Sequence, residues 1–268
     1  MITVKSLRKY FPIKQGVLQK TVGFVKAVDD VSFRIERGET LALVGESGSG
    51  KTTTGRLVLR LLDADSGEVL FDGRNIFDVG KKEMLKLRSN MQIIFQDPFS
   101  SLNPRMNVKS IVSEGLVVRG GYTKGEIDKW CDYALEMVGL TTECKHRYPH
   151  QFSGGERQRI GIARAIILNP KFIVCDEPVS SLDVSIQAKI LRLLKDLKEN
   201  LKLTYLFIGH DLSVVANICD KVAVMHNGRI VEMGDVKSVY TNPRDSYTKK
   251  LLASIPIPDP RARCNTPR

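Results

Sequence analysis

The sequence predicts an α/β fold, in which a mainly parallel β-sheet is covered by helices on both faces and a helical segment is inserted. Short apolar runs at 40–44, 172–175 and 203–208 have the length and composition of buried parallel strands. Helical patterns alternate with these runs, and this alternation is typical of parallel sheets. From about 97 to 165 the pattern is helical only, so we expect this stretch to form the insertion.

The composition is that of an ordinary globular protein. Apolar residues make up 42% of the 268 residues and charged residues 26%, which excludes collagen-like, low-complexity and intrinsically disordered classes. The 41 Lys and Arg outnumber the 30 Asp and Glu and give a net charge of +11. This charge favours polyanionic partners, namely nucleotide phosphates, nucleic acid or an anionic membrane surface. A basic surface that serves only solubility explains the charge alone equally well.

Neither a membrane span nor a secretion signal is predicted. No run reaches the roughly 18 apolar residues of a spanning helix, and residues 1–5 lack the charged head and apolar core of a signal peptide. The five cysteines are scattered without a CxxC pair, which indicates neither a disulfide framework nor a zinc site. We therefore expect the protein to reside in a reducing cytosol. If the chain acts at a membrane, we expect it to do so through partner proteins.

Before the insertion, the predicted elements are strands, one helix and a further strand. Residues 1–44 are typical of short strands and turns. A strand at 69–71 with a turn at Asp72-Gly73 is expected after the helix, which should end before Ser66-Gly67. The apolar face of that helix is formed by Leu57, Val58, Leu61 and Leu62.

For one helix of the insertion, the sequence predicts both the N-terminus and the face that is buried. Thr123 and Glu126 have the spacing of a capping box, and Gly139 suits a C-terminal stop. We expect Trp130 to lie in the core rather than to form a ligand platform. The full apolar stripe, which repeats with the helical period, comprises Ile127, Trp130, Cys131, Ala134, Leu135 and Val138.

After the insertion, strands and helices alternate again. Strands at 222–225 and 229–232 flank Asn227-Gly228, a strong signal for a hairpin turn. From 256 to 268, prolines and arginines are frequent, so we expect an extended basic tail with little structure of its own. An amphipathic helix between the strands 172–175 and 203–208 is marked by Ile186, Ile190, Leu193, Leu194 and Leu197.

A phosphate-binding loop is predicted at residues 45–52, Gly-Glu-Ser-Gly-Ser-Gly-Lys-Thr, which match GxxxxGK[ST] without a mismatch. The motif follows a predicted strand and opens a predicted helix. Its glycines let backbone N–H groups form a nest around a phosphate, and the helix N-terminus adds partial positive charge. Lys51 can reach the β and γ phosphates, and the Thr52 hydroxyl can ligate Mg²⁺. A chance glycine-rich turn is the alternative.

Two carboxylates, Asp176 and Glu177, end the apolar strand 172–175. An Asp at a strand end near a phosphate loop suits a direct or water-mediated contact with Mg²⁺. The neighbouring Glu would face the γ phosphate, where it can orient and deprotonate an attacking water. Without the phosphate loop, an exposed acidic strand end would be the simpler interpretation.

A second helix start has the features of an anion site. Ser153 and Glu156 again have capping-box spacing, and Gly154 and Gly155 leave bare N–H groups at the mouth of the helix. The site is built like the first but has no lysine. A plain helix cap with adventitious glycines is the alternative.

These motifs and others, taken in order, resemble those of ABC transporter nucleotide-binding subunits over nearly the whole chain. In the signature, Phe152 replaces the usual Leu and Glu156 the usual Gln. The ordered set is a Walker A loop (45–52), a Q-loop (Gln96), a signature (152–156), a Walker B pair (Asp176 and Glu177), a D-loop (181–183) and a switch histidine (His210).

The resemblance implies a P-loop NTPase (RecA-like) core with an N-terminal antiparallel β subdomain and an inserted α-helical subdomain. We therefore expect a single ABC ATPase domain over 1–256 and a basic, Pro-rich tail at 257–268. Within the domain, 1–96 and 166–256 would form the core and the β subdomain, and 97–165 the helical subdomain.

The resemblance also implies roles for the residues around the γ phosphate. Two subunits would pack head to tail, so that the signature residues of one, 153–156, cap the γ phosphate held by the other. Glu177 would be the catalytic base. Gln96 would reach Mg²⁺ and the attacking water, and Asp183 would act across the dimer interface. His210 would hold the γ phosphate, although a histidine satisfied at a strand end is the alternative.

ATP and Mg²⁺ are the cofactors that the resemblance implies. The metal ligands would be Thr52, Gln96 and Asp176. An aromatic residue near the N-terminus would stack on adenine, either Phe11, which we prefer, or Tyr10. The remaining nucleotide contacts would come from Gly45, Glu46, Ser47, Gly48, Ser49, Gly50, Lys51, Thr52 and Thr53.

Three stretches are similar to the ATPases of oligopeptide and dipeptide importers: 92–104, 179–187 and 255–260, the last resembling the second of two ATPase subunits. This implies an ATP-hydrolysing subunit that powers peptide import at the cytoplasmic face of the inner membrane, and nickel chelates or glutathione-like solutes are alternative cargoes in the same group. Its partners would be a second ATPase subunit, either a different chain or another copy, and two transmembrane permease subunits. An extracytoplasmic peptide-binding protein would act indirectly, and nucleic acid would not be a partner.

Two other functions compete with transport. A non-transport ABC ATPase, acting in DNA repair, on chromosome structure or at the ribosome, is compatible with the basic charge. The single cassette without a coiled-coil insertion argues against it. A nucleotide-binding module without turnover is disfavoured because Glu177 and His210 are both present.

Overall fold

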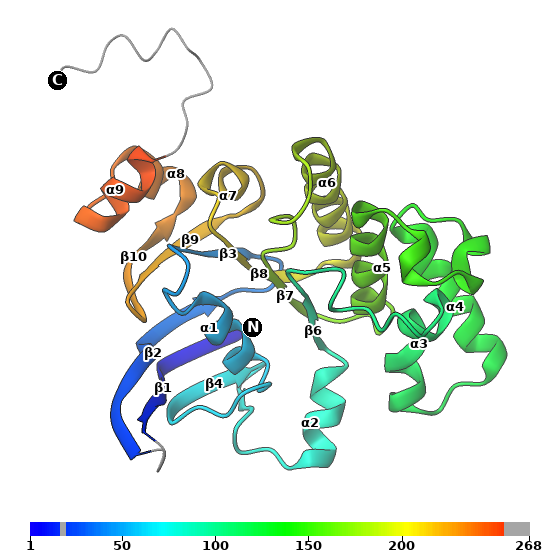
Figure 1. The fold of residues 1–268 in the computed structure, drawn as a ribbon, viewed down its shortest axis with the longest axis horizontal. Helices are drawn as coiled ribbons and strands as arrows, with labels where there is room; N and C mark the ends of the chain where they lie inside the picture. Colours follow the sequence, from blue (N-terminus) through cyan, green and yellow to red (C-terminus); the bar gives the residue numbers. More distant parts are fainter. Residues whose placement is uncertain (17–19, 255–268) are drawn as a thin grey trace, which may run out of the picture.

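A six-stranded sheet crosses the centre of the computed structural model, which describes residues 1–16 and 20–254 (Figure 1). The strand order is β10-β9-β3-β8-β7-β6, with β10 antiparallel to β9 and the other neighbours parallel. Because β8 lies between β3 and β7, the loops that follow these three strands emerge side by side. The strands are β3 (Thr40–Val44), β6 (Met91–Ile94), β7 (Phe172–Asp176), β8 (Thr204–Gly209), β9 (Lys221–His226) and β10 (Arg229–Asp235).

A second, antiparallel sheet of order β2-β1-β4-β5 covers one face of the first (Figure 1). The expectation of short strands holds for β3 but is wrong for residues 1–35, since β1 and β2 are 14 and 16 residues long. Several register shifts along the β1–β2 pair interrupt the alternation of apolar residues, although the strands continue. The bounds are β1 (Ile2–Gln15), β2 (Lys20–Ile35), β4 (Ser66–Phe71) and β5 (Arg74–Asn75).

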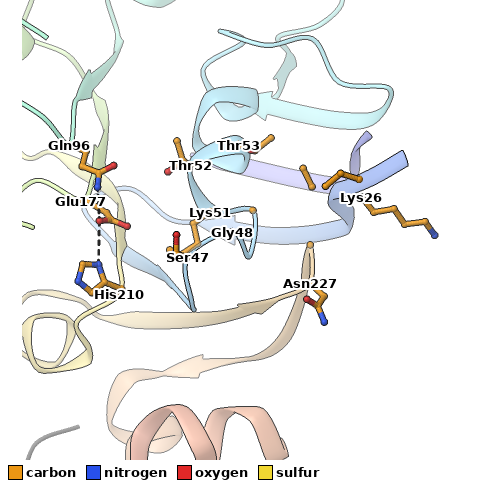
Figure 2. Close-up of a pocket in the computed structure, with 14 residues that line it drawn as sticks. Lys26, Ser47, Gly48, Lys51, Thr52, Thr53, Gln96, Glu177, His210 and Asn227 are labelled. Atoms are coloured by element: carbon orange, nitrogen blue, oxygen red, sulfur yellow. Dashed lines mark hydrogen bonds and ion pairs between the residues drawn. The ribbon is translucent and has the colours of Figure 1, made fainter. Parts of the chain in front are cut away.

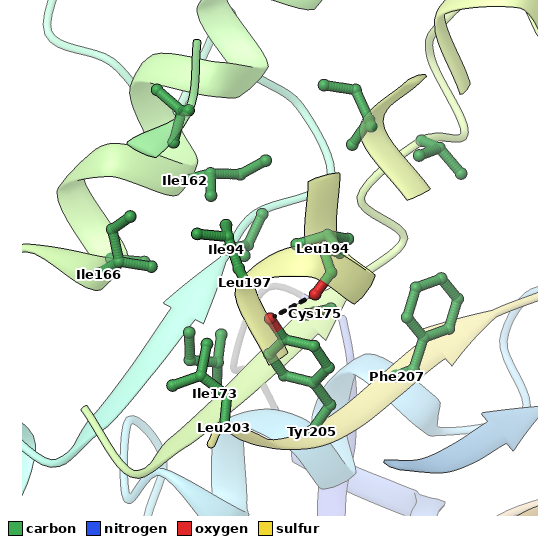
Figure 3. Close-up of a cluster of buried hydrophobic side chains, with 14 of the residues drawn as sticks. Ile94, Ile162, Ile166, Ile173, Cys175, Leu194, Leu197, Leu203, Tyr205 and Phe207 are labelled. Atoms are coloured by element: carbon green, nitrogen blue, oxygen red, sulfur yellow. Dashed lines mark hydrogen bonds between the residues drawn. The ribbon is translucent and has the colours of Figure 1, made fainter. Parts of the chain in front are cut away.

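Alternation along the central strands sorts their side chains onto two cores. Leu41 of β3 packs with the antiparallel sheet and with helix α1 (Lys51–Val58), whereas its neighbour Ala42 packs with the helices on the other face. Both side chains are fully buried, as in other parallel sheets covered on two faces. Figure 3 shows part of the helix-side core, where the Tyr205 hydroxyl donates to the carbonyl oxygen of Leu194 at 3.0 Å.

The predicted helical insertion lies between β6 and β7. Its helix α4 begins with the predicted capping box, because Thr123 accepts from the Glu126 N–H while the Glu126 carboxylate accepts from the Thr123 N–H. The insertion contains α3 (Val108–Arg119), α4 (Lys124–Met137), α5 (Gly154–Ile166) and short 3₁₀ turns at 142–146 and 149–151.

The expectation that Trp130 lies in the core is wrong. The buried stripe of α4 comprises Cys131, Ala134 and Leu135 and continues to Val138, the residue that follows the helix. Trp130 lies at the edge of this stripe, with 41% of its surface exposed, and packs edge-to-face against Tyr133.

Helix α1 is shorter than predicted. It ends at Val58, and Arg60 adopts a left-handed backbone conformation with φ 49°. The Arg60 guanidinium donates to the carbonyl oxygens of Ile76 and Val79, both at 2.7 Å. Leu61 therefore lies beyond the helix and is 46% exposed.

The C-terminal part begins with the predicted strand β7, helix α6 (Val184–Leu201) and strand β8, and continues with the predicted hairpin, where Asn227 and Gly228 both have positive φ. The tail prediction falls on residues outside those described. The remaining elements, which were not predicted from the sequence, are α2 (Lys81–Arg88), β6, α7 (Leu212–Ile218), α8 (Val236–Thr241) and α9 (Ser246–Ala253). Among the residues described, no helix is both long and apolar enough to cross a membrane.

Candidate active site

The phosphate loop and the predicted catalytic residues line one cavity of about 880 Å³ (Figure 2). They meet there because the loops after β3, β7 and β8 leave the same edge of the sheet, where ligands of α/β proteins bind. Gln96, Glu177 and His210 lie at one end of the cavity, and Lys26 and Asn227 lie toward the other (Figure 2). The loop contributes Ser47, Gly48, Gly50, Lys51, Thr52 and Thr53.

Close backbone contacts require glycine at two positions of the loop. A Cβ on Gly45 (φ 151°) would lie 2.1 Å from the carbonyl oxygen of Met225 in β9. A Cβ on Gly50 (φ 104°) would lie 2.0 Å from the carbonyl oxygen of Ala27 in β2. The strands β2 and β9 thus enclose the loop, and only glycine fits at these two points.

Lys51 lies inside the loop rather than in solvent. Its Nζ donates to the carbonyl oxygens of Gly45 at 2.7 Å and Glu46 at 2.8 Å. Burial lowers the pKa of Lys51, and the nearby carboxylates oppose this shift. The ammonium is therefore held in the nest, where phosphate oxygens would compete with the two carbonyls for its protons.

Thr52 and Asp176 bring two oxygen donors together below the loop. The Thr52 hydroxyl donates to Oδ1 of Asp176 at 2.9 Å. Asp176 is 4% exposed, and burial raises the pKa of its carboxyl group. A hydroxyl and a carboxylate are the hard oxygen ligands that Mg²⁺ accepts alongside phosphate oxygens and water, so the residues present fit this metal.

Glu177 is held between the two other predicted catalytic residues. Its Oε2 accepts a hydrogen bond from Nε2 of Gln96 at 3.0 Å and lies 3.2 Å from Nδ1 of His210. The backbone of Glu177 is left-handed, with φ 45°, and its N–H donates to the carbonyl oxygen of Ile208 in β8. This geometry aims the carboxylate into the cavity, where it can accept a proton from a water molecule.

The signature and the D-loop aspartate do not line this cavity. Ser153 caps α5 in a capping box with Glu156, as predicted. A Cβ on Gly155 would lie 2.6 Å from Cγ2 of Ile186 in α6, so this glycine also has a packing role that the sequence did not indicate. Asp183 is exposed at the N-terminus of α6. The predicted second anion site therefore does not line the cavity of the phosphate loop in its own chain.

The structure separates the two aromatic candidates for adenine stacking. The Tyr10 hydroxyl donates to Asp29, so this residue already has a structural partner. Phe11 is 38% exposed and pairs across the hairpin with Val25, which lines the cavity, but Phe11 itself is not among the lining residues. Its role in stacking stays a prediction.

Several cavity residues were not predicted as site residues. They are Val25, Lys26 and Ala27 of β2 and Asn227 and Gly228 of the β9–β10 turn. For Asn227-Gly228 the sequence predicted a hairpin turn but no role in the site. The sequence carried no local sign that this turn and the middle of β2 border the phosphate loop.

The chain matches known families over most of its length. Residues 28–180 match the family described as "ABC transporter", and residues 231–268 match "Oligopeptide/dipeptide transporter, C-terminal region". The oligopeptide transport ATP-binding protein AppF of Bacillus subtilis is 49% identical over 96% of this chain and 78% of its own length. The dipeptide transport ATP-binding protein DppF of Lactococcus lactis is 53% identical over 89% of this chain and 77% of its own.

Solved structures support the same assignment. The ATP-binding cassette MJ0796, in a dimeric post-hydrolysis state with ADP and Pi, superposes with a TM-score of 0.75 at 29% identity and covers 88% of this chain. That match covers 99% of the cassette. The central sheet, the antiparallel sheet and the helical insertion are thus those of an ABC cassette. The chain belongs to the ABC transporter family of ATPases, within its oligopeptide and dipeptide transporter branch.

Proposed function

We propose that the chain binds and hydrolyses MgATP in a head-to-tail dimer and thereby powers the import of oligopeptides or dipeptides. The observation that carries this proposal is the position of Glu177, whose carboxylate is held by Gln96 and His210 at the edge of the phosphate-loop cavity. An acid–base group, a nest of N–H groups and a buried cation together suit phosphoryl transfer to water.

Residues 45–53 would bind the phosphates, with Lys51 as their cationic partner. Thr52 and Asp176 would hold Mg²⁺, which offsets phosphate charge when bound. The predicted third ligand, Gln96, remains compatible with this site because it lines the same cavity as Thr52. Glu177 would orient the attacking water and accept its proton, and His210 would position the γ phosphate.

The separation of the two predicted anion sites supports a dimer. The N–H groups at the mouth of α5 lie apart from the cavity of their own chain, so a second chain turned head to tail could bring them to the γ phosphate. The dimeric form of MJ0796 supports this arrangement. The second ATPase would be either a different chain or another copy. We also propose that 97–165 moves as a helical subdomain relative to 1–96 and 166–256.

Import at the cytoplasmic face of the inner membrane is supported by the names of the relatives, which are oligopeptide and dipeptide transport proteins. Two transmembrane permease subunits would receive the motion, and an extracytoplasmic binding protein would deliver peptide. These relatives and the C-terminal family match favour transport over a role in DNA repair or at the ribosome.

The proposal is tested by measuring ATP turnover per chain over a series of dilutions, with light scattering on the same samples. A composite site requires the rate per chain to fall as the dimer dissociates. A constant rate from a protein that stays monomeric would exclude the shared site. In vesicles containing the permease subunits, turnover should rise with a peptide-loaded binding protein and stay unchanged with the peptide-free form.

A further inference from the structure

The C-terminal helix α9 contacts the phosphate loop, although the two lie 201 residues apart in the sequence. The backbone N–H of Glu46 donates to the hydroxyl oxygen of Tyr247 at 3.1 Å. Tyr247 is half-buried and is the second residue of α9. A loop whose function depends on the direction of its N–H groups thus has one of them fixed by a side chain from the end of the chain.

The ring of Tyr247 makes a second contact near the same cavity. It packs on the imidazole of His226, with ring centroids 3.9 Å apart and an angle of 30° between the planes. His226 ends β9, and the next two residues, Asn227 and Gly228, line the cavity. The Gly228 N–H donates to the carbonyl oxygen of Ser49 at 3.0 Å. The hairpin turn and α9 therefore support the phosphate loop together.

The position of Tyr247 is itself fixed by two carboxylates. Asp245 caps α9 by accepting from the backbone N–H of Tyr247 at 2.8 Å. Glu232 of β10 accepts from the backbone N–H groups of Arg244 at 2.8 Å and Asp245 at 3.1 Å. The start of α9 is thus tied to the central sheet, so Tyr247 meets the loop from a defined direction.

We propose that Tyr247 is a positioning residue for the phosphate loop, through which the C-terminal region sets the affinity of the site for MgATP. This inference rests on the proposed function, in which the loop binds the phosphates. Neither Glu46 nor Tyr247 lines the cavity, so Tyr247 acts on the loop without touching the bound nucleotide. Without this hydrogen bond the free loop would sample more conformations, and MgATP would have to restrict them on binding. This entropic cost weakens binding and leaves the chemical step unchanged.

The test compares Tyr247→Phe with Tyr240→Phe. Tyr240 belongs to the same C-terminal region, and its hydroxyl donates to the carbonyl oxygen of Leu212 in α7 at 2.6 Å rather than to the phosphate loop. Tyr247→Phe should raise the KM for MgATP and the Kd for MgADP about fivefold, the value of one net hydrogen bond, with kcat unchanged. Tyr240→Phe should lower the Tm and leave KM and Kd unchanged.

Amide hydrogen exchange over 45–51 gives a direct signature, because it should speed up in Tyr247→Phe and not in Tyr240→Phe. Tyr247→Ala, which also removes the ring from His226, should weaken MgADP binding further than Tyr247→Phe. A Kd for MgADP in Tyr247→Phe within twofold of wild type, or an equal rise in Tyr240→Phe, would overturn the inference alone. A wild-type chain that binds no MgADP would overturn the proposed function as well.

Discussion

The side-chain amide of Gln96 donates a hydrogen bond to Oε2 of Glu177 at 3.0 Å, and this bond joins the start of the helical insertion to the acidic pair. Gln96 follows β6, the last element before the insertion, and Glu177 follows the neighbouring strand β7. A shift of the insertion relative to the sheet would therefore change how the carboxylate is held. In the proposed function, this contact would link a permease that binds the insertion to the site of hydrolysis.

Glu177→Gln should keep ATP binding and lose most turnover, because an amide cannot accept the proton of the attacking water. General bases contribute about a hundredfold or more to rates, so we expect kcat to fall at least that far and the closed dimer to accumulate. Turnover assays and light scattering with ATP check this. Asp63→Asn, at an 87% exposed side chain, is the control and should behave as wild type. Wild-type turnover in Glu177→Gln would remove Glu177 from its role.

Lys51→Ala should weaken nucleotide binding about tenfold to a hundredfold, because a charge-assisted hydrogen bond to phosphate is lost. Calorimetry with MgADP measures the effect without turnover. Lys82→Ala changes an exposed lysine on α2, outside the cavity, and serves as the control. Unchanged affinity in Lys51→Ala would contradict the assignment of residues 45–52 as a phosphate loop.

Ser153→Arg should leave MgADP binding intact in the monomer while dimerisation and hydrolysis fail together. The bulky cation would block the helix mouth that we propose to meet the partner's γ phosphate. The substitution also removes a helix cap worth about 1 kcal/mol. Thr123→Arg removes the matching capping box of α4 and is the control for that loss. A fully active Ser153→Arg dimer, seen by light scattering, would be incompatible with a composite site.

Asp29 gives a prediction for pH. Its carboxylate accepts from the Tyr10 hydroxyl and from Arg229 at 2.7 and 2.9 Å, and these contacts hold its pKa below the ordinary value. Because the folded pKa is the lower one, the stabilisation is fully present above the unfolded pKa of about 3.9 and is lost as pH falls through the folded pKa.

Asp29→Asn should accordingly lower the Tm near neutral pH, and the difference from wild type should shrink in acid. Thermal unfolding followed by circular dichroism between pH 7 and pH 3 measures this. Asp30→Asn changes the exposed neighbour and should leave the shape of the profile unchanged. A difference between wild type and Asp29→Asn that stays constant down to pH 3 would show that the Asp29 carboxylate does not stabilise the fold by its charge.

Where a prediction from the sequence was wrong, the reason was a packing arrangement with segments that are distant in the sequence. The apolar face predicted for α1 continued through Leu62, yet the chain turns at Arg60, whose guanidinium donates to the carbonyl oxygens of Ile76 and Val79. Trp130 satisfied the helical period but lies at the edge of the stripe that meets the core. The apolar pattern of a helix indicates which side chains could be buried, whereas the packing of the helix against its neighbours determines which ones are.

The sequence by itself determined the strands β3, β7 and β8, the β9–β10 hairpin, the phosphate-loop motif, the acidic strand end and the two capping boxes, because these depend on backbone conformation and hydrogen bonds within a few residues. Only the tertiary structure decided that β8 separates β3 from β7, that Gln96 and His210 hold Glu177 between them, and that Asn227 and Tyr247 border or support the loop. Contacts between such distant segments follow from how the sheet and its layers assemble, and no short stretch of sequence encodes that assembly.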